Sequence, residues 1–173
     1  MKNLKLTILA FATILMFFAS CKKNKTALPV EFKFVLLDTL GNEKTVFNQG
    51  ENLIFSFQVI NNGSEDLMLE NFFPNDDFFR VYQLNTNGGT LDYGVPYDGY
   101  IKIGYFTIPL KDTLKIEFPW KGNADILEYP ILFNNKNNSS FDNGNFYTEF
   151  TQSFKIGDIQ TEEKHFRIDF TVK

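Results

Sequence analysis

The sequence predicts an all-β domain in which two antiparallel sheets pack face to face. Three observations lead to this fold class. Apolar and polar residues alternate with period two, aromatic residues make up 17% of the chain, and turns rich in Gly and Asn separate the alternating segments. A strand with one apolar and one polar face is the unit that a sandwich of antiparallel sheets requires.

The alternation is clearest in four segments. In one of them Phe55 and Phe57 share a face, and Ser56 takes the opposite, polar face. The same parity places Trp120 in the core and His165 on a polar surface. The four segments are Glu31–Asp38, Asn52–Asn61, Asp112–Trp120 and Lys164–Lys173, and weaker strands are expected at Leu67–Leu69, Phe78–Leu84, Tyr100–Ile108 and Phe146–Ile156.

Glycines between these segments predict tight turns that need a positive φ. They are Gly41, Gly50, Gly63, Gly88 and Gly144. The Asn-rich stretch from Phe133 to Asn145 has too few apolar residues to bury itself, and it is expected to be a mobile loop.

The first 20 residues predict an export signal. Lys2 and Lys5 precede an uncharged segment from Leu6 to Ala19. As a helix this segment would be about 21 Å long, shorter than the roughly 30 Å hydrocarbon core of a bilayer. It is therefore expected to be cleaved rather than to span the membrane.

The residues Phe18-Ala19-Ser20-Cys21 resemble a bacterial lipobox, and Cys21 is the only cysteine. The resemblance implies that residues 1–20 are a lipoprotein signal peptide and that Cys21 becomes the lipid anchor. Residues 21–29 would form the lipidated tether, and residues 30–173 the folded domain. The resemblance is to Bacteroidota lipoproteins, whose surface-exported members tend to carry acidic residues right after the Cys. Because this tether is basic instead, we expect the protein on the outer membrane, facing the periplasm.

The run from Gly50 to Asn62 is similar to the "Gly-Glu, strand, Asn" signature of bacterial immunoglobulin-like domains, including those of the BsuPI proteinase-inhibitor type. Asp142-x-Gly144-x-Phe146 is similar to the Asp-x-Gly-x-Tyr motif before strand F, with Phe in place of Tyr. Thr148 stands where the disulfide Cys of such domains would be. The resemblance spans roughly residues 45 to 172, and it implies an immunoglobulin-like antiparallel β-sandwich of about seven to nine strands.

Two sets of residues are candidates for recognition or modification. Four tyrosines lie among glycines between Leu91 and Phe106, a composition typical of adaptable recognition surfaces, although packing over the end of the sandwich is the alternative. They are Tyr93, Tyr97, Tyr100 and Tyr105. Thr39 and Thr113 lie in Asp-Thr-Leu triplets that resemble O-glycosylation sites of exported Bacteroidota proteins, and both hydroxyls are expected to face solvent.

The sequence does not contain a combination of residues typical of a catalytic or metal-binding site. His165 is the only histidine. The pairs Asp76-Asp77 and Asp92 with Asp98 are expected to be solvated loop acids, so neither an enzyme, a metal site nor a cofactor is predicted. Removal of Lys2 and Lys5 leaves 15 basic against 21 acidic residues, which disfavours nucleic acid as a partner.

These observations predict a non-enzymatic, lipid-anchored envelope protein that acts as a binding or scaffolding module. Its expected partners are the membrane, through the lipid, and a protein or glycan ligand. Two alternatives remain open at this point: a proteinase inhibitor of BsuPI-like type, and an accessory glycan-binding lipoprotein.

Overall fold

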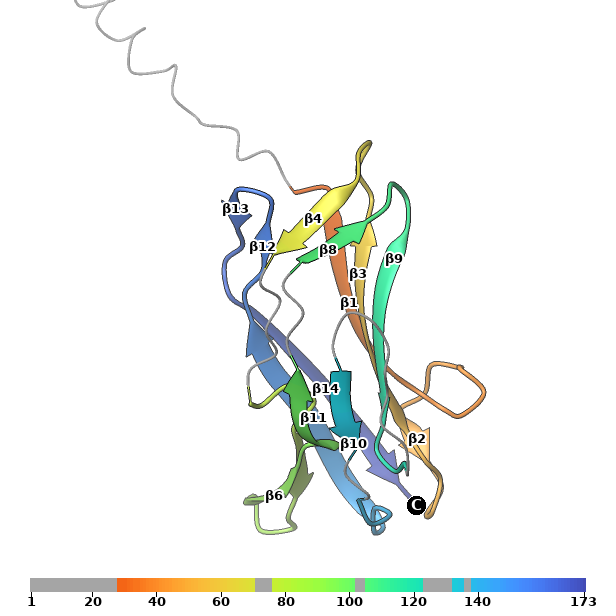
Figure 1. Ribbon diagram of the computed structural model, residues 1–173. Helices are drawn as coiled ribbons and strands as arrows, with labels where there is room; N and C mark the ends of the chain where they lie inside the picture. The colour runs from red at the N-terminus through yellow and green to blue at the C-terminus, as the bar shows by residue number, and fades with distance from the viewer. Residues whose placement is uncertain (1–27, 71–75, 102–104, 123–131, 136–137) are drawn as a thin grey trace, which may run out of the picture.

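The computed structural model describes residues 28–70, 76–101, 105–122, 132–135 and 138–173 of the chain, and the side chains of 98–101 and 132–135 are outside this description. All regular elements in these ranges are β-strands, as predicted (Figure 1). The signal segment and Cys21 lie outside the described residues.

Two sheets form the sandwich. The first has three antiparallel strands in the order β1 (Val30–Leu37), β3 (Ile54–Asn61) and β9 (Thr113–Pro119). The second has five strands in the order β2 (Val46–Phe47), β14 (Lys164–Val172), β11 (Gly144–Gln152), β5 (Val81–Leu84) and β6 (Thr90–Gly94). In the second sheet only the pairing of β2 with β14 is parallel.

This strand order confirms the immunoglobulin-like architecture. In chain order β1, β3 and β9 correspond to strands A, B and E, while β5, β6, β11 and β14 correspond to C, C′, F and G. The Asp142 motif immediately precedes β11, the strand that corresponds to F.

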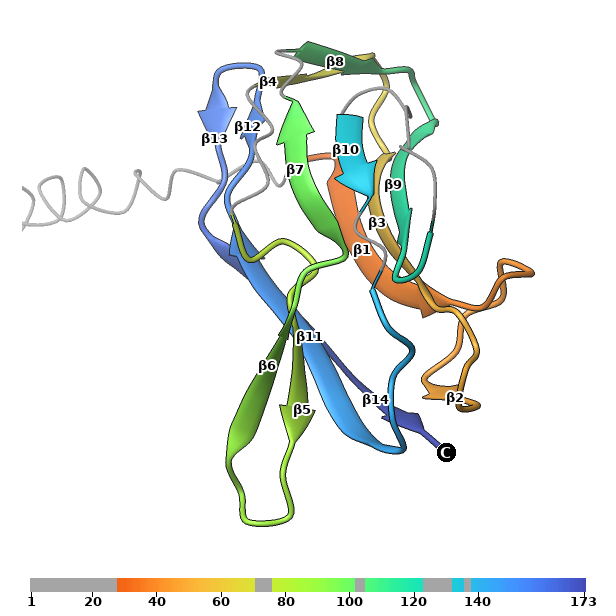
Figure 2. The same cartoon turned by 60° about the horizontal axis from the view of Figure 1, so that its bottom comes forward.

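A smaller sheet covers one end of the sandwich. Its order is β13 (Ile159–Gln160), β12 (Lys155–Ile156), β4 (Leu67–Glu70) and β8 (Tyr105–Ile108). A separate pair joins β10 (Leu132–Asn135) to β7 (Tyr97–Ile101), and Figure 2 shows this pair beside the sandwich.

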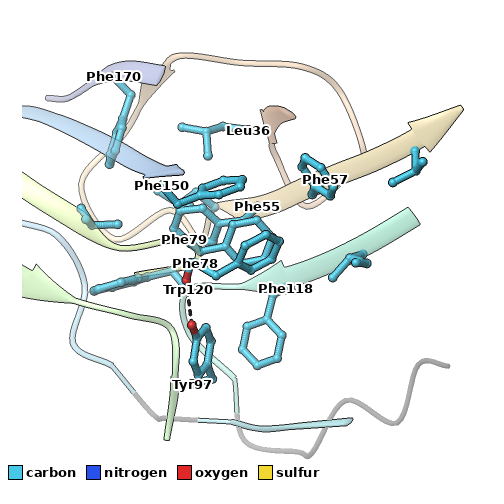
Figure 3. Close-up of a cluster of buried hydrophobic side chains, with 14 of the residues drawn as sticks. Leu36, Phe55, Phe57, Phe78, Phe79, Tyr97, Phe118, Trp120, Phe150 and Phe170 are labelled. Atoms are coloured by element: carbon cyan, nitrogen blue, oxygen red, sulfur yellow. Dashed lines mark hydrogen bonds between the residues drawn. The ribbon is translucent and has the colours of Figure 1, made fainter. Parts of the chain in front are cut away.

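Phenylalanine rings fill the space between the two sheets. Phe57 of β3 lies 5.7 Å from Phe150 of β11 and 5.2 Å from Phe166 of β14, measured between ring centroids. Phe34 of β1 also meets Phe150, at 5.0 Å. Figure 3 shows Phe55 and Phe150 gathered with Phe78 and Phe79. The parity predicted for Phe55, Phe57 and Trp120 is confirmed, because all of these side chains are buried.

The two sheets of the sandwich hold eight strands, three and five, within the predicted seven to nine. Short strands outside them, such as β12 and β13, bring the described strands to fourteen. Two local predictions are wrong. The segment predicted as one strand at Tyr100–Ile108 contributes to two, β7 and β8. The stretch from Phe133 to Asn145 is not simply a loop: β10 pairs with β7, and Phe141 is buried against Trp120 with ring centroids 4.5 Å apart. Ser56 lies on the polar face, as predicted, and it is nevertheless buried: its hydroxyl donates to Glu117 Oε1 at 3.0 Å and accepts from Gln58 Nε2 at 3.2 Å.

Glycine conformation is predicted correctly at three of the five positions. Gly41, Gly50 and Gly88 have positive φ. Gly63 and Gly144 do not, and the reason for glycine there is space: an added Cβ would lie 2.9 Å from Asn61 Oδ1 at Gly63, and 2.9 Å from Gln83 Nε2 at Gly144.

Candidate functional site

The predicted tyrosine cluster does not form a common surface. Tyr97 is buried, and its hydroxyl donates a 2.9 Å hydrogen bond to the carbonyl of Phe78 (Figure 3). It is therefore a core residue, which corrects its assignment as ligand-facing. Tyr93 is half-buried and stacks on Phe141 with ring centroids 5.7 Å apart. Tyr105 is 63% exposed, but it belongs to β8, at the other end of the molecule from β6 (Figure 2).

The side chain of Tyr100 lies outside the described residues. Tyr93, Tyr97 and Tyr105 separate because the segment that holds them enters three different sheets, through β6, β7 and β8. The alternative, that these rings pack on the core, is correct for Tyr93 and Tyr97.

The two threonine candidates occupy different environments. Thr39 is exposed, in the turn that follows β1. The Asp38 carboxylate holds that turn, accepting 2.9 Å hydrogen bonds from the main-chain N–H groups of Leu40 and Asn42. Thr113 is only half-exposed at the start of β9, paired with Ile60.

A groove lies at the end of the five-stranded sheet, where the β5–β6 hairpin meets the start of β11. It consists of two adjoining hollows of about 500 Å³ and about 310 Å³, which share Leu84 and Asn145. The larger hollow is lined by Gln83, Leu84, Asn85, Thr86, Asn87, Gly89, Asn143, Gly144 and Asn145. We call these two hollows the amide groove.

Local backbone geometry shapes the larger hollow. The N–H of Asn85 donates to the carbonyl of Gly89 at 2.8 Å, and the N–H of Gly88 returns a 3.0 Å bond to the carbonyl of Asn85. Gly88 has a φ of 79°, a backbone conformation that is strained for residues with a Cβ atom. The hairpin turn is therefore closed by its own backbone, which leaves its side chains available.

The lining of the larger hollow is uncharged and rich in amides. Within the described part of the chain, the side chains of Gln83, Asn85, Asn87 and Asn143 make no hydrogen bond. Asn145 differs, because its Oδ1 accepts a 3.0 Å bond from the Thr171 hydroxyl. Each free amide offers two N–H donors and one carbonyl acceptor. These groups can therefore bind a neutral ligand that carries many hydroxyl or amide groups.

Apolar side chains complete the groove. Asn145 pairs with Leu84 on one side and with Thr171 on the other, and Thr171 pairs with Val46. Leu84 and Val46 are both exposed. Across four strands the floor thus has two polar side chains in the middle and an apolar side chain at each end, which suits a ligand with both hydroxyl groups and C–H faces.

The charged groups of the same sheet face bind one another, and one of them, Asp169, lines the smaller hollow. Tyr82 and Tyr147 stack with centroids 4.9 Å apart, and the Arg167 guanidinium lies 3.9 Å from the Tyr147 ring. Arg167 bonds to Asp169 at 2.8 Å, which raises the pKa of the guanidinium. Arg80 likewise bonds to Asp77 and Asp92, at 2.6 and 2.8 Å. Both arginines are therefore already neutralised, so this face does not favour anions.

The remaining candidates are isolated or structural. His165 is exposed, with Nε2 3.2 Å from Glu149. In the described ranges no three His, Cys, Asp or Glu side chains come together as a metal site would require. Trp120 is buried and donates from Nε1 to the carbonyl of Ser139 at 2.8 Å. Within those same ranges, no helix has the length and hydropathy to cross a bilayer.

The groove residues were not singled out from the sequence, which treats Asn85–Gly89 and Asp142–Asn145 as turn signals. The available signal was that two Asn-rich turns, which contain Asn85 and Asn143, 58 residues apart, flank strands that could pair. Only the pairing of β5 with β11 brings them together.

Comparison with models of protein families found no match, and comparison with curated protein sequences found none either. Among solved structures, the chain is similar to the ASH/PapD-like domain 7 of human CEP192, with 11% identity, a TM-score of 0.39, and coverage of 88% of this chain and 93% of that chain. It is also similar to the Northeast Structural Genomics Consortium target SoR45, with 16% identity, a TM-score of 0.30, and coverage of 80% and 84%. Neither likeness bears on function.

Proposed function

We propose that the mature protein is a non-enzymatic binding module of the cell envelope, anchored by lipid at Cys21, that binds a neutral oligosaccharide in the amide groove. The immunoglobulin-like fold and the groove support the binding role. The resemblance of Phe18–Cys21 to a lipobox supports the anchor. We place the domain on the periplasmic side of the outer membrane of a Bacteroidota-type bacterium, because the tether after Cys21 is basic.

The observation that carries the ligand class is the uncharged, amide-rich lining of the larger hollow, where four side-chain amides make no hydrogen bond to other described residues. Sugar hydroxyls both donate and accept hydrogen bonds, which matches side-chain amides. Leu84 and Val46 would lie against the C–H face of a sugar ring. An anionic ligand would find the nearby cationic groups already paired, since Arg80 and Arg167 are held in ion pairs.

Binding tests this proposal directly. The full-length protein in detergent should bind neutral oligosaccharides on a glycan array, and titration calorimetry should measure the affinity. Asn85→Ala and Asn143→Ala should each weaken binding about 10-fold, since a lost hydrogen bond costs roughly 1.4 kcal/mol. Asn62→Ala is the matched control, because Asn62 is an exposed amide on the β3–β4 turn, away from the groove. If all three variants bound the oligosaccharide with the affinity of the wild type, the groove would be rejected as the binding site.

A second candidate is proteinase inhibition through the β5–β6 hairpin. Figure 2 shows this hairpin projecting from the body of the domain, and its backbone bonds give it the rigidity that an inhibitory loop needs. Inhibition of trypsin or subtilisin, abolished by replacing Thr86–Gly88, would favour this function. Glycan binding without inhibition would favour the first.

The anchor and its location need separate tests. Cys21→Ala should abolish acylation and move the protein from the membrane to the soluble fraction. Protease added to intact cells should leave the wild-type domain uncut if it faces the periplasm. Membrane retention of the variant after a salt wash would contradict the lipid anchor, and rapid cleavage would contradict the periplasmic location.

A further inference from the structure

The N-terminal side of the described chain begins at one end of the sandwich. The carbonyl of Pro29 accepts a 2.9 Å hydrogen bond from the N–H of Asn62, in the β3–β4 turn. The carbonyl of Asn62 in turn accepts from Lys111 Nζ at 2.8 Å. The N–H of Leu110 bonds to Asp66 Oδ1 at 2.9 Å. The β3–β4 and β8–β9 turns therefore lie beside the point where the tether reaches the domain (Figure 1).

Exposed apolar side chains gather around the same end. Met68 is 48% exposed, Tyr105 63%, Leu110 48% and Ile159 49%. Three of them belong to the small sheet that covers this end, and Leu110 belongs to the adjoining turn.

Strand alternation explains why these side chains point away from the core. Leu69, Phe106 and Ile108 are buried, so their strand neighbours lie on the outer face of the small sheet. On that face Met68 is paired with Thr107, and Tyr105 with Glu70. Met68 and Tyr105 are thus diagonal neighbours on adjacent strands.

We infer that this outer face, formed by β4, β8 and the β8–β9 turn, rests on the bilayer that holds the lipid of Cys21. The inference depends on the proposed lipid anchor. Leu28 is seven residue steps along the chain from Cys21, and even a fully extended chain of this length reaches only about 25 Å. The end of the domain that carries Leu28 must therefore lie close to the membrane surface.

The chemistry of the face fits the interfacial region of a bilayer. Tyrosine places its ring among acyl chains and its hydroxyl among headgroups, and lysine extends its ammonium group in the same way. Lys111 and Lys155 occur here together with Asp66, Glu70 and Asp158, so the face carries no excess of positive charge. Contact therefore depends on apolar insertion, with little preference for anionic lipid. The amide groove lies at the opposite end and would face away from the membrane (Figures 1 and 2).

A lipid-quenching experiment on the full-length, lipidated protein tests the inference. Because Cys21 is the only cysteine and its thiol is consumed by the lipid, a single introduced cysteine can carry a fluorophore. Thr107→Cys places the probe on the outer face, and Thr86→Cys places it on the β5–β6 turn as a matched control; both residues are exposed. The protein is reconstituted in vesicles of phosphatidylethanolamine and phosphatidylglycerol that contain a doxyl-labelled lipid.

We expect quenching at Thr107→Cys to be at least 3-fold stronger than at Thr86→Cys, as an order-of-magnitude consequence of contact with lipid. Adding Tyr105→Glu and Leu110→Glu should reduce that quenching at least 2-fold while the protein still floats with the vesicles. Floating protein with equal, weak quenching at both positions would overturn the inference and leave the anchor intact. Self-quenching between labelled copies without quenching by lipid would also overturn the inference, because it would show that the outer face binds a second copy of the protein. Protein that does not float at all would contradict the lipid anchor itself.

Discussion

The side-chain amide of Asn61 donates a 3.1 Å hydrogen bond to the main-chain carbonyl of Ile108, 47 residues further along the chain. The same amide donates to the carbonyls of Glu65 and Pro109, at 2.8 and 3.1 Å. Its Oδ1 accepts a 2.8 Å bond from the N–H of Gly63. Asn61 is completely buried. One side chain therefore satisfies backbone groups of two turns at the end of the domain where the tether begins.

Asn61→Ala should destabilise the domain by about 2 to 3 kcal/mol, because it leaves buried carbonyl groups without donors. Urea unfolding followed by tryptophan fluorescence measures this, since Trp120 is the only tryptophan and is buried. Asn62→Ala is the neighbouring control and should change stability by less than about 0.5 kcal/mol, because Asn62 is exposed. Similar losses in both variants would contradict the role of Asn61.

Thr148→Val should stabilise the domain by about 1 kcal/mol. The Thr148 side chain is fully buried on β11, and its hydroxyl has no hydrogen-bond partner among the described residues. Valine keeps the shape and removes a desolvated polar group. Thr171→Val is the opposite case, because its hydroxyl donates to Asn145 at 3.0 Å. We expect that variant to lose stability in the same urea assay, and a loss at both positions would contradict the prediction for Thr148.

The stability of the domain should fall in acid partly through Asp38. Hydrogen bonds from the main chain and then the side chain of Asn42 lower the pKa of the Asp38 carboxyl below its ordinary value of 3.8. A pKa that is lower in the folded state stabilises the protein above pH 3.8, and this contribution disappears as the pH falls through the folded pKa.

Asp38→Asn should therefore be less stable than wild type at pH 6, with the difference shrinking at pH 2. Thermal unfolding across this range measures the difference in Tm. Asp158→Asn is the control, because the exposed Asp158 carboxylate accepts no hydrogen bond from the described residues. A constant difference between wild type and Asp38→Asn from pH 6 to pH 2 would exclude the carboxyl as the cause.

The sequence was sufficient to predict the four long strands, because each of them buries one face and exposes the other, which makes apolar and polar residues alternate. The bounds of β1, β3, β9 and β14 differ from the predicted segments by at most two residues at each end. The two-residue strands were not predicted, because two residues are too few to show an alternating pattern. Their pairing depends on where the neighbouring strands already lie. Phe133 illustrates this dependence, since its strand exists only through pairing with β7.

The candidate site was less predictable, because it depends on long-range pairing. Tyr93, Tyr97 and Tyr105 are close in sequence, yet the chain crosses between sheets within this segment and separates them. Asn85 and Asn143 are distant in sequence, yet the register of β5 with β11 brings them to one groove. Local composition indicates which side chains can bind a ligand, but topology decides which of them meet.

The last prediction concerns O-glycosylation at the two Asp-Thr-Leu triplets. A transferase must reach both the threonine hydroxyl and the apolar residue after it. Thr39 is exposed and Leu40 is 85% exposed, in a turn outside the strands. Thr113 is only half-exposed and the following Leu114 packs against the core, which corrects the expectation that both threonines present themselves equally to solvent. We therefore expect a glycan on Thr39 and little or none on Thr113.

Mass spectrometry of the mature protein from its native host decides between these sites. The peptide that contains Thr39 should carry the added mass, and Thr39→Ala should remove it. Thr113→Ala should leave the mass of the remaining glycopeptide unchanged. An unmodified Thr39 peptide would refute the prediction. A glycan on Thr113 alone would show that accessibility in the folded domain does not select the site, as would be the case if the glycan were transferred before the domain folds.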